Sequence, residues 1–167
     1  FESTSEQILV LYQRLPGCLR VLDNDQHQFD PSLPDEIRAI LTYSNPDQIL
    51  FNQADVLPTI FQGEPVLGGW CYFFEKADLA RQRGDWDQVA GFANQAFEGG
   101  FHDALIKHAP EYVVFIEGYA HNAQWKRAAE LTLEVYEVDP RMDQMLCAAW
   151  GRIKIDIPES SEKSAFL

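Results

Sequence analysis

The sequence predicts an α+β protein that is mostly helical, with a small N-terminal α/β piece packed on an array of antiparallel helix pairs. Two stretches, 70–99 and 112–140, carry the same helix–turn–helix pattern, and their turn tryptophans, Trp86 and Trp125, are 39 positions apart. Short β-branched and aromatic runs occur in the first third of the chain instead. The content of 46% hydrophobic and 13% aromatic residues is ample for a packed core and argues against disorder.

The charge balance excludes two classes of partner. The chain has 26 acidic and 13 basic side chains, which gives a formal net charge of −13. Such a charge repels a phosphate backbone and an anionic lipid leaflet, so we expect no nucleic-acid binding and no direct binding to a lipid surface. No run in the sequence reaches the roughly 18 apolar residues that a membrane-spanning helix needs.

The first elements are expected to be two short strands. The runs Ile8–Tyr12 and Cys18–Leu22 are rich in β-branched and aromatic residues, and Pro16-Gly17 between them is a turn signal. This pattern predicts a hairpin, or two strands of a small sheet. The polar stretch Asp23–Asp25 is expected to end the second strand.

A short helix is expected after the loop at 31–34. Pro34 is tolerated in a first helical turn, and the acids Asp35 and Glu36 suit the positive end of the helix dipole. The run 48–51 is a candidate third strand, and 56–69 is typical of a linker or an irregular lid. Three apolar side chains of the short helix are expected to face inward: Ile37, Ile40 and Leu41.

From Trp70 onward the apolar pattern is helical. Gly84 and the pair Gly99-Gly100 are expected to end the first two helices, since glycine is favoured just past a helix C-terminus. A short extra turn or helix is expected at 102–108. The predicted domain division is therefore 1–69, 70–158 and a tail at 159–167, with one integrated domain as the alternative. The predicted helices cover 70–83, 86–97, 110–122, 126–138 and 142–153.

The three cysteines are far apart in the sequence. Cys18, Cys71 and Cys147 show neither a C-x-x-C spacing nor the density of a disulfide framework. Buried free thiols are the favoured interpretation, because cysteine behaves as a small hydrophobic residue. A single disulfide is the alternative, and the sequence does not assign its pairing.

The turn Gly84-Asp85-Trp86-Asp87, with Ala77 before it and Ala96 after it, resembles the tetratricopeptide repeat. That family has small residues where its two helices approach, and glycine followed by an aromatic residue at the turn. The resemblance covers roughly 70–140. It implies antiparallel helix pairs that bind a protein or peptide partner.

The second unit follows this pattern less closely. Trp125 takes the turn-aromatic position and Ala128 the small position, but Ala123 replaces the turn glycine. In the first unit Val89 stands where the family has alanine. Independent arrays usually need three repeats. We therefore expect the N-terminal piece and a capping helix at 142–153 to complete the burial.

Two further stretches give a second resemblance. Pro16–Asp23 and Trp70–Asp78 look like stretches in the soluble C-terminal region of some bacterial polytopic membrane proteins, including glycosyltransferase-like ones. This resemblance implies a bacterial domain that is tethered to a membrane and lies at the cell surface or extracytoplasmic side. The start at Phe1, without an initiator methionine, is expected for a fragment of a longer protein.

A partner-binding groove follows from the tetratricopeptide resemblance. Its mixed acidic, basic and apolar lining would receive an extended peptide or a partner helix. Replacing both Arg81 and Glu117 by alanine is expected to abolish binding with little effect on thermal stability. The groove would be lined by first-helix residues: Phe74, Asp78, Arg81, Gln82, Val113, Glu117 and His121.

No motif predicts catalysis, a metal site or a cofactor site. The four histidines lack metal-ligand spacing. His27 is expected in a polar loop. The glycine-rich stretch 63–69 lacks the Lys-Ser/Thr of a phosphate-binding loop. Solvated helix faces and pairs such as Asp78–Arg81 are favoured over an acid–base site for five charged residues: Glu75, Asp78, Arg81, Arg83 and Glu117.

Three functions are weighed from these features. The leading hypothesis is a non-enzymatic protein-interaction or scaffold module, a fragment of a larger protein, without cofactor or metal. The alternative is an extracytoplasmic accessory domain of a bacterial membrane glycosyltransferase-like protein. A stand-alone enzyme for small molecules is third, and a pocket with converging polar groups at the junction of sheet and helices would favour it.

Overall fold

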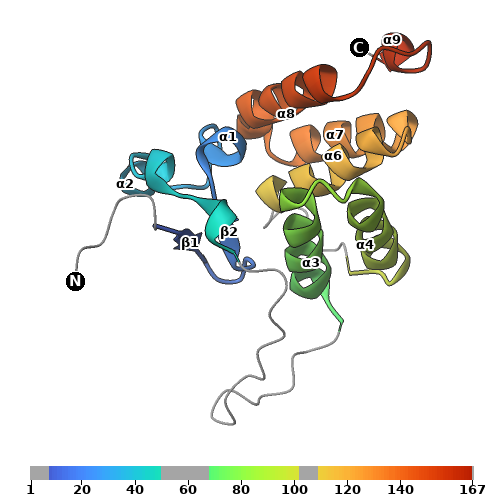
Figure 1. The fold of residues 1–167 in the computed structure, drawn as a ribbon. Coiled ribbons are helices and arrows are strands. Elements are labelled where there is room, and N and C mark those ends of the chain that lie inside the picture. Colours follow the sequence, from blue (N-terminus) through green and yellow to red (C-terminus); the bar gives the residue numbers. More distant parts are fainter. Residues whose placement is uncertain (1–7, 50–67, 102–108, 167) are drawn as a thin grey trace.

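The computed structural model of the chain describes residues 8–49, 68–101 and 109–166. It confirms the predicted fold class: the chain is mostly helical, with a small antiparallel sheet near its N-terminus (Figure 1). The N-terminal piece lies to one side of packed, antiparallel helix pairs (Figure 1). The predicted linker at 56–69 lies outside the described residues except for Gly68 and Gly69, and the predicted turn at 102–108 lies outside them entirely.

The two predicted strands are present. Strand β1 (Val10–Tyr12) pairs antiparallel with β2 (Arg20–Leu22), with Val10 opposite Leu22. Side chains alternate across a strand, so Val10 is buried while its neighbour Leu11 is exposed. The buried side of this sheet contributes to a small hydrophobic cluster of its own: Val10, Leu22, Leu33 and Leu41.

A helix directly follows β2, where the sequence analysis expected only the end of a strand. Helix α1 (Asn24–His27) begins because the Asp23 carboxylate accepts the Gln26 N–H at 2.8 Å, which caps the first turn. The prediction of a polar loop around His27 is therefore wrong. The His27 side chain is buried in this helix.

The second short helix is confirmed, but its inward face is only partly as expected. Helix α2 (Asp35–Arg38) is followed by the 3₁₀ turns η2 (Leu41–Tyr43) and η3 (Pro46–Gln48). Leu41 is buried and Ile37 half-buried, whereas Ile40 is exposed because the helix has already ended before it. Gln48 lies in η3 and Ile49 is not in a strand, and the rest of the predicted third strand lies outside the described residues.

The helices after Trp70 agree closely with the prediction. The longer helices are α3 (Trp70–Gln82), α4 (Trp86–Glu98), α6 (Val113–His121), α7 (Trp125–Val138) and α8 (Asp143–Asp156). Helix α3 packs against α4, α4 against α6, and α6 against both α7 and α8. The 3₁₀ turns η5 (Ala109–Tyr112) and η6 (Pro140–Met142) precede α6 and α8.

The turns of the two helix pairs have the same backbone geometry. Gly84 has φ +68°, and Ala123, 39 positions later, has φ +56°. Glycine adopts this left-handed conformation freely, whereas alanine is strained there. In each turn the next residue donates its N–H to the carbonyl five positions earlier: Asp85 to Ala80 at 3.0 Å, and Gln124 to Tyr119 at 2.8 Å.

The two pairs meet where α4 crosses α6. Gly118 of α6 has no room for a side chain, because a Cβ there would lie 2.4 Å from Val89 Cγ1 and 3.3 Å from the Ala90 nitrogen. Val89 is fully buried in this contact. The Val89 side chain of α4 therefore fits against α6 because position 118 has no side chain.

The C-terminal segment folds against the helices, although the sequence analysis expected a tail at 159–167. Helix α9 (Lys163–Phe166) packs against α7. The Lys163 ammonium is buried and donates hydrogen bonds to the carbonyls of Lys154 and Ile157, and it pairs with Glu159 at 2.9 Å. A lysine that binds the last carbonyls of α8 stabilises the end of that helix.

Candidate functional site: the inner face

The inner face is the side of α3, α6 and α8 that is turned toward the N-terminal piece. Phe74, Asp78, Val113 and Glu117 are buried there, and the Arg81 side chain is 8% exposed. These five of the seven predicted groove residues line one small cavity together with residues of the N-terminal piece: Arg20, Gln26 and His27. The structure therefore brings the predicted residues together beneath a segment of their own chain.

The first ion pair of the inner face joins residues of α3. Arg81 donates from Nε and Nη2 to Asp78 Oδ1, at 2.9 and 2.7 Å. This is the i,i+3 pair that the sequence predicts. Asp23 Oδ2, at the start of α1, lies 3.7 Å from Arg81 Nη2. This contact connects the N-terminal piece to the Asp78–Arg81 ion pair.

The second ion pair joins α6 to α8. Arg152 donates from Nε to Glu117 Oε1 at 2.8 Å, and its Nη2 lies 2.7 Å from the same oxygen. Its Nη1 donates to the main-chain carbonyl of Asp25 in α1 at 2.9 Å. No local sequence pattern points to Arg152, because its partners come from other elements.

Burial changes the protonation of the inner face. Burial raises the pKa of Glu117, although Arg152 and Arg81 oppose the change. Burial also raises the pKa of Asp23, again against Arg81. For Arg81, burial lowers the pKa but Asp78 and Glu117 outweigh it, so the pKa is raised and the guanidinium stays charged.

His27 is held neutral in this environment. Burial lowers its pKa well below the usual value, and the positive charges of Arg81 and Arg20 lower it further. Its Nδ1 accepts the main-chain N–H of Asp23 at 3.1 Å, which a neutral imidazole can do. His27 therefore stabilises the segment around α1 from within, whereas Asp23 and the Asp25 carbonyl connect that segment to Arg81 and Arg152 of the helices.

The cavity enclosed by these groups has a volume of about 20 Å³. That space holds roughly one water molecule. Glu117 Oε2 lies buried without a hydrogen-bond partner among the described residues, so it is the acceptor that such a water would satisfy. The expectation that Asp78, Arg81 and Glu117 lie on solvated helix faces is wrong, whereas Glu75 and Arg83 are exposed.

A disulfide fastens the N-terminal piece to α3. Cys18, just before β2, is bonded to Cys71 in the first turn of α3, with the Cα atoms 5.1 Å apart. Cys147 is free and exposed. The favoured interpretation of three buried free thiols is thus wrong. The 53 positions between the bonded cysteines carry no local signal that pairs them.

Glu111, which the sequence analysis did not single out, forms a second connection beside the disulfide. Its buried carboxylate accepts the Cys18 main-chain N–H at 2.8 Å and the indole N–H of Trp70. Glu111 lies in η5, so one carboxylate connects the segment just before β2, the start of α3 and the turn that precedes α6. A buried charge with these donors stabilises the contact of the three segments.

The two remaining predicted groove residues lie apart from the cavity. Gln82 donates to Asp78 Oδ2 at 3.1 Å and lies partly exposed at the end of α3. His121 stacks on the Trp86 ring with centroids 3.8 Å apart and an interplanar angle of 5°. Trp86 and His121 therefore belong to the contact between the two turns.

A cleft of about 320 Å³ lies at the junction of the hairpin and the helices. Its buried charged groups are already bonded within the protein: Arg20 pairs with Asp30 and donates to Ser32, and Glu111 accepts from Cys18 and Trp70. The Arg20 bonds lie within the N-terminal piece, whereas Glu111 joins that piece to the helices. The third hypothesis, a small-molecule enzyme, stays a prediction.

In the part of the chain that the structure describes, no helix has both the length and the apolar character that crossing a membrane requires. No group of three or more histidine, cysteine, aspartate or glutamate side chains there is arranged to hold a metal ion.

The fold and the enclosed inner face define a class of protein: mostly helical, built from packed antiparallel helix pairs, and compatible with a helical-repeat fold. No family model, no curated protein and no solved structure matches this chain.

Proposed function

We propose that the chain is a non-enzymatic interaction module, a tetratricopeptide-like array whose inner face holds polypeptide segments. One observation carries the proposal. The inner face contacts the segment Arg20–His27 of its own chain, through the Asp23–Arg81 ion pair and the Arg152–Asp25 carbonyl hydrogen bond. Recognition of side-chain charge together with a main-chain carbonyl is what a peptide-binding groove requires.

The enclosure of the charged groups favours this function over catalysis. General acid–base chemistry needs a group within hydrogen-bonding reach of a substrate. Asp78 and Glu117 are engaged with partners around a cavity of about 20 Å³, which leaves no room there for a substrate beyond a water molecule. Arg81 also borders an open pocket of about 400 Å³, but its guanidinium is bonded to Asp78 and lies beside Asp23. Their arrangement supports a role in holding the N-terminal piece.

The proposal is tested by offering the segment in trans. A labelled peptide of residues 18–30, with serine at position 18, is added to the full chain carrying Cys18→Ser, Cys71→Ser and Asp23→Ala. These changes remove the disulfide and the ion pair of the internal segment. We expect the peptide to bind this variant, and to bind the unchanged chain at least roughly tenfold more weakly, because the internal segment competes at a high effective concentration. Fluorescence anisotropy measures both.

A charge-reversed peptide, with Asp23→Lys and Asp25→Lys, is the matched control and should lose binding. Circular dichroism checks that the variant remains folded. Equal binding of both peptides, or no binding to the folded variant, would contradict a peptide-holding inner face.

The alternative function is an extracytoplasmic accessory domain of a bacterial membrane glycosyltransferase-like protein. The Cys18–Cys71 disulfide favours it, because disulfides persist in oxidising compartments. Alkylation of the denatured chain, taken from cells without reductant, should modify Cys147 alone. Modification of Cys18 and Cys71 as well would remove this support.

A further inference from the structure

The start of α7 lacks the cap that the equivalent start of α4 has. At α4 the Asp85 carboxylate accepts the Gln88 N–H at 3.2 Å. At α7 the corresponding residue, Gln124, makes no side-chain hydrogen bond to the helix. The first main-chain N–H groups of a helix have no partner within it, so the first turn of α7 has donors that need an outside acceptor.

The tryptophan of the same turn adds a further donor. Trp125 is 4% exposed, and its indole Nε1 has no hydrogen-bond partner among the residues that the structure describes. Burying an N–H without an acceptor is unfavourable, and buried tryptophans usually have one. This observation is independent of the missing cap and points to the same need for an acceptor.

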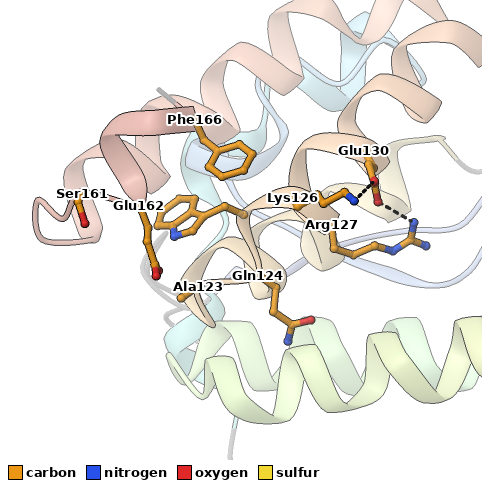
Figure 2. A pocket seen from close by; sticks show the side chains of 9 residues that line it. Ala123, Gln124, Lys126, Arg127, Glu130, Ser161, Glu162 and Phe166 are labelled. Atoms are coloured by element: carbon orange, nitrogen blue, oxygen red, sulfur yellow. Dashed lines mark ion pairs between the residues drawn. The ribbon is translucent and has the colours of Figure 1, made fainter.

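The residues at the start of α7, among them Gln124 and Trp125, help to line an open pocket of about 690 Å³. Figure 2 shows the pocket between the start of α7, with Gln124 and Lys126, and the C-terminal segment, with Glu162 and Phe166. Phe166 is 46% exposed, so the pocket combines an aromatic wall with the donors of α7. This site is separate from the inner face.

The charges of the first turn favour an anionic acceptor. Lys126 and Arg127 lie there, and the turn contains no acidic residue. Cations oppose the positive end of a helix dipole, whereas an anion is favoured at that place. Glu130, one turn further on, lies 3.8 Å from Lys126 and 4.0 Å from Arg127 and directs both side chains away from the helix start (Figure 2).

We propose that the first turn of α7, together with the Trp125 indole, binds a carboxylate of a partner polypeptide, an acidic side chain that caps the helix in trans. One carboxylate oxygen would accept from the main-chain N–H groups and the other from the indole. The apolar part of the partner would lie against Phe166. Because the site does not involve the inner face, it stands or falls independently of the peptide-holding function.

The test follows the indole N–H resonances of the full chain by two-dimensional ¹H–¹⁵N NMR. The protein has 4 tryptophans, and Trp125→Phe assigns the resonance of interest. Aspartate blocked at both its amino and its α-carboxyl group is titrated, against sodium chloride of the same ionic strength. We expect a saturable shift of the Trp125 indole resonance with the blocked aspartate only.

Gln124→Asp supplies the cap within the chain and should weaken the binding of blocked aspartate roughly tenfold, about the effect of one capping interaction. Gln144→Asp is the matched control, because it adds the same charge at an exposed position in the first turn of α8 and should leave binding unchanged.

Four outcomes would overturn the proposal. These are an equal shift with chloride, a shift that does not saturate, tighter binding of inorganic phosphate than of blocked aspartate, and binding that Gln124→Asp leaves unchanged. A fifth outcome concerns Glu162 of this chain, whose carboxylate lines the same pocket. A shift of the Trp125 resonance on Glu162→Gln without any ligand would also overturn the proposal, because the acceptor would then come from this chain.

Discussion

The two helix pairs differ in how their equivalent positions are stabilised. In the first pair, the turn has glycine at its left-handed position and an aspartate cap, and Asp78 finds its cation three residues along the same helix. In the second pair, alanine occupies the left-handed position, and Glu117 takes its cation from Arg152 of α8. The first pair satisfies its polar groups locally, whereas the second depends on neighbouring segments.

The largest effect is expected at the ion pair between α6 and α8. Arg152→Met leaves the carboxylate of Glu117 buried without its cation, and we expect a loss of about 3 kcal/mol in unfolding free energy at pH 7. Urea denaturation measures it. The double variant Glu117→Gln with Arg152→Met should recover at least half of the loss.

Arg127→Met provides the control for that measurement. Arg127 pairs with Glu130 and Glu134 at a half-exposed site, where an ion pair contributes less than about 1 kcal/mol. If Arg152→Met proves no more harmful than Arg127→Met, the buried ion pair between α6 and α8 contributes no more to stability than an exposed one.

The second-largest change in stability is expected at the contact between the two helix pairs. Gly118→Ala places a Cβ against Val89, and we expect a loss of about 1–2 kcal/mol from overpacking, in spite of the better helix propensity of alanine. In a Val89→Ala background the same change should be neutral or stabilising. Thermal unfolding of the four proteins forms a double-mutant cycle, and additive effects would contradict direct contact.

The buried histidine predicts a pH dependence of the N-terminal piece. The folded-state pKa of His27 is lowered, so the unfolded chain binds more protons near pH 6, and folding stability falls as the pH falls below about 6.5. Between pH 7.5 and pH 5.5 this group alone should remove about 1 kcal/mol.

His27→Gln should abolish that part of the pH dependence. The difference in unfolding free energy between the unchanged protein and His27→Gln, followed against pH, separates the contribution of His27 from those of Glu117 and Asp23. Their raised pKa values act with the opposite sign, because stability from these carboxyl groups is present at low pH and is lost as the pH rises. A difference that stays constant between pH 7.5 and pH 5.5 would count against a buried neutral His27.

The smallest effects are expected at the turns, and they have opposite signs. Gly84→Ala should destabilise the protein by about 1 kcal/mol, because an L-residue is strained at a φ of +68°. Ala123→Gly should stabilise it by about 0.5 kcal/mol, since the relief of strain exceeds the added flexibility of the unfolded chain. Chemical denaturation with the same sign for both variants would show that the turns are not equivalent.

The sequence was informative about elements and much less so about the site. Glycine and proline at 84, 99 and 140 predicted where the helices end, and the runs at 8–12 and 18–22 predicted the two strands, because these signals act within a few residues. The capping aspartate Asp23 was the local signal that was missed. Arg152 could not be assigned, because its interaction with Glu117 spans 35 positions.

The sequence by itself determined the mostly helical class and the two equivalent turns, and it predicted five of the residues that lie on the inner side of α3 and α6. Only the tertiary structure decided what covers that side. The Cys18–Cys71 disulfide, the Asp23–Arg81 pair and the bond from Arg152 to the Asp25 carbonyl join segments that are 53, 58 and 127 positions apart. Helical periodicity acts over a few residues, whereas contacts at these separations exist only once the N-terminal piece has packed on the helices.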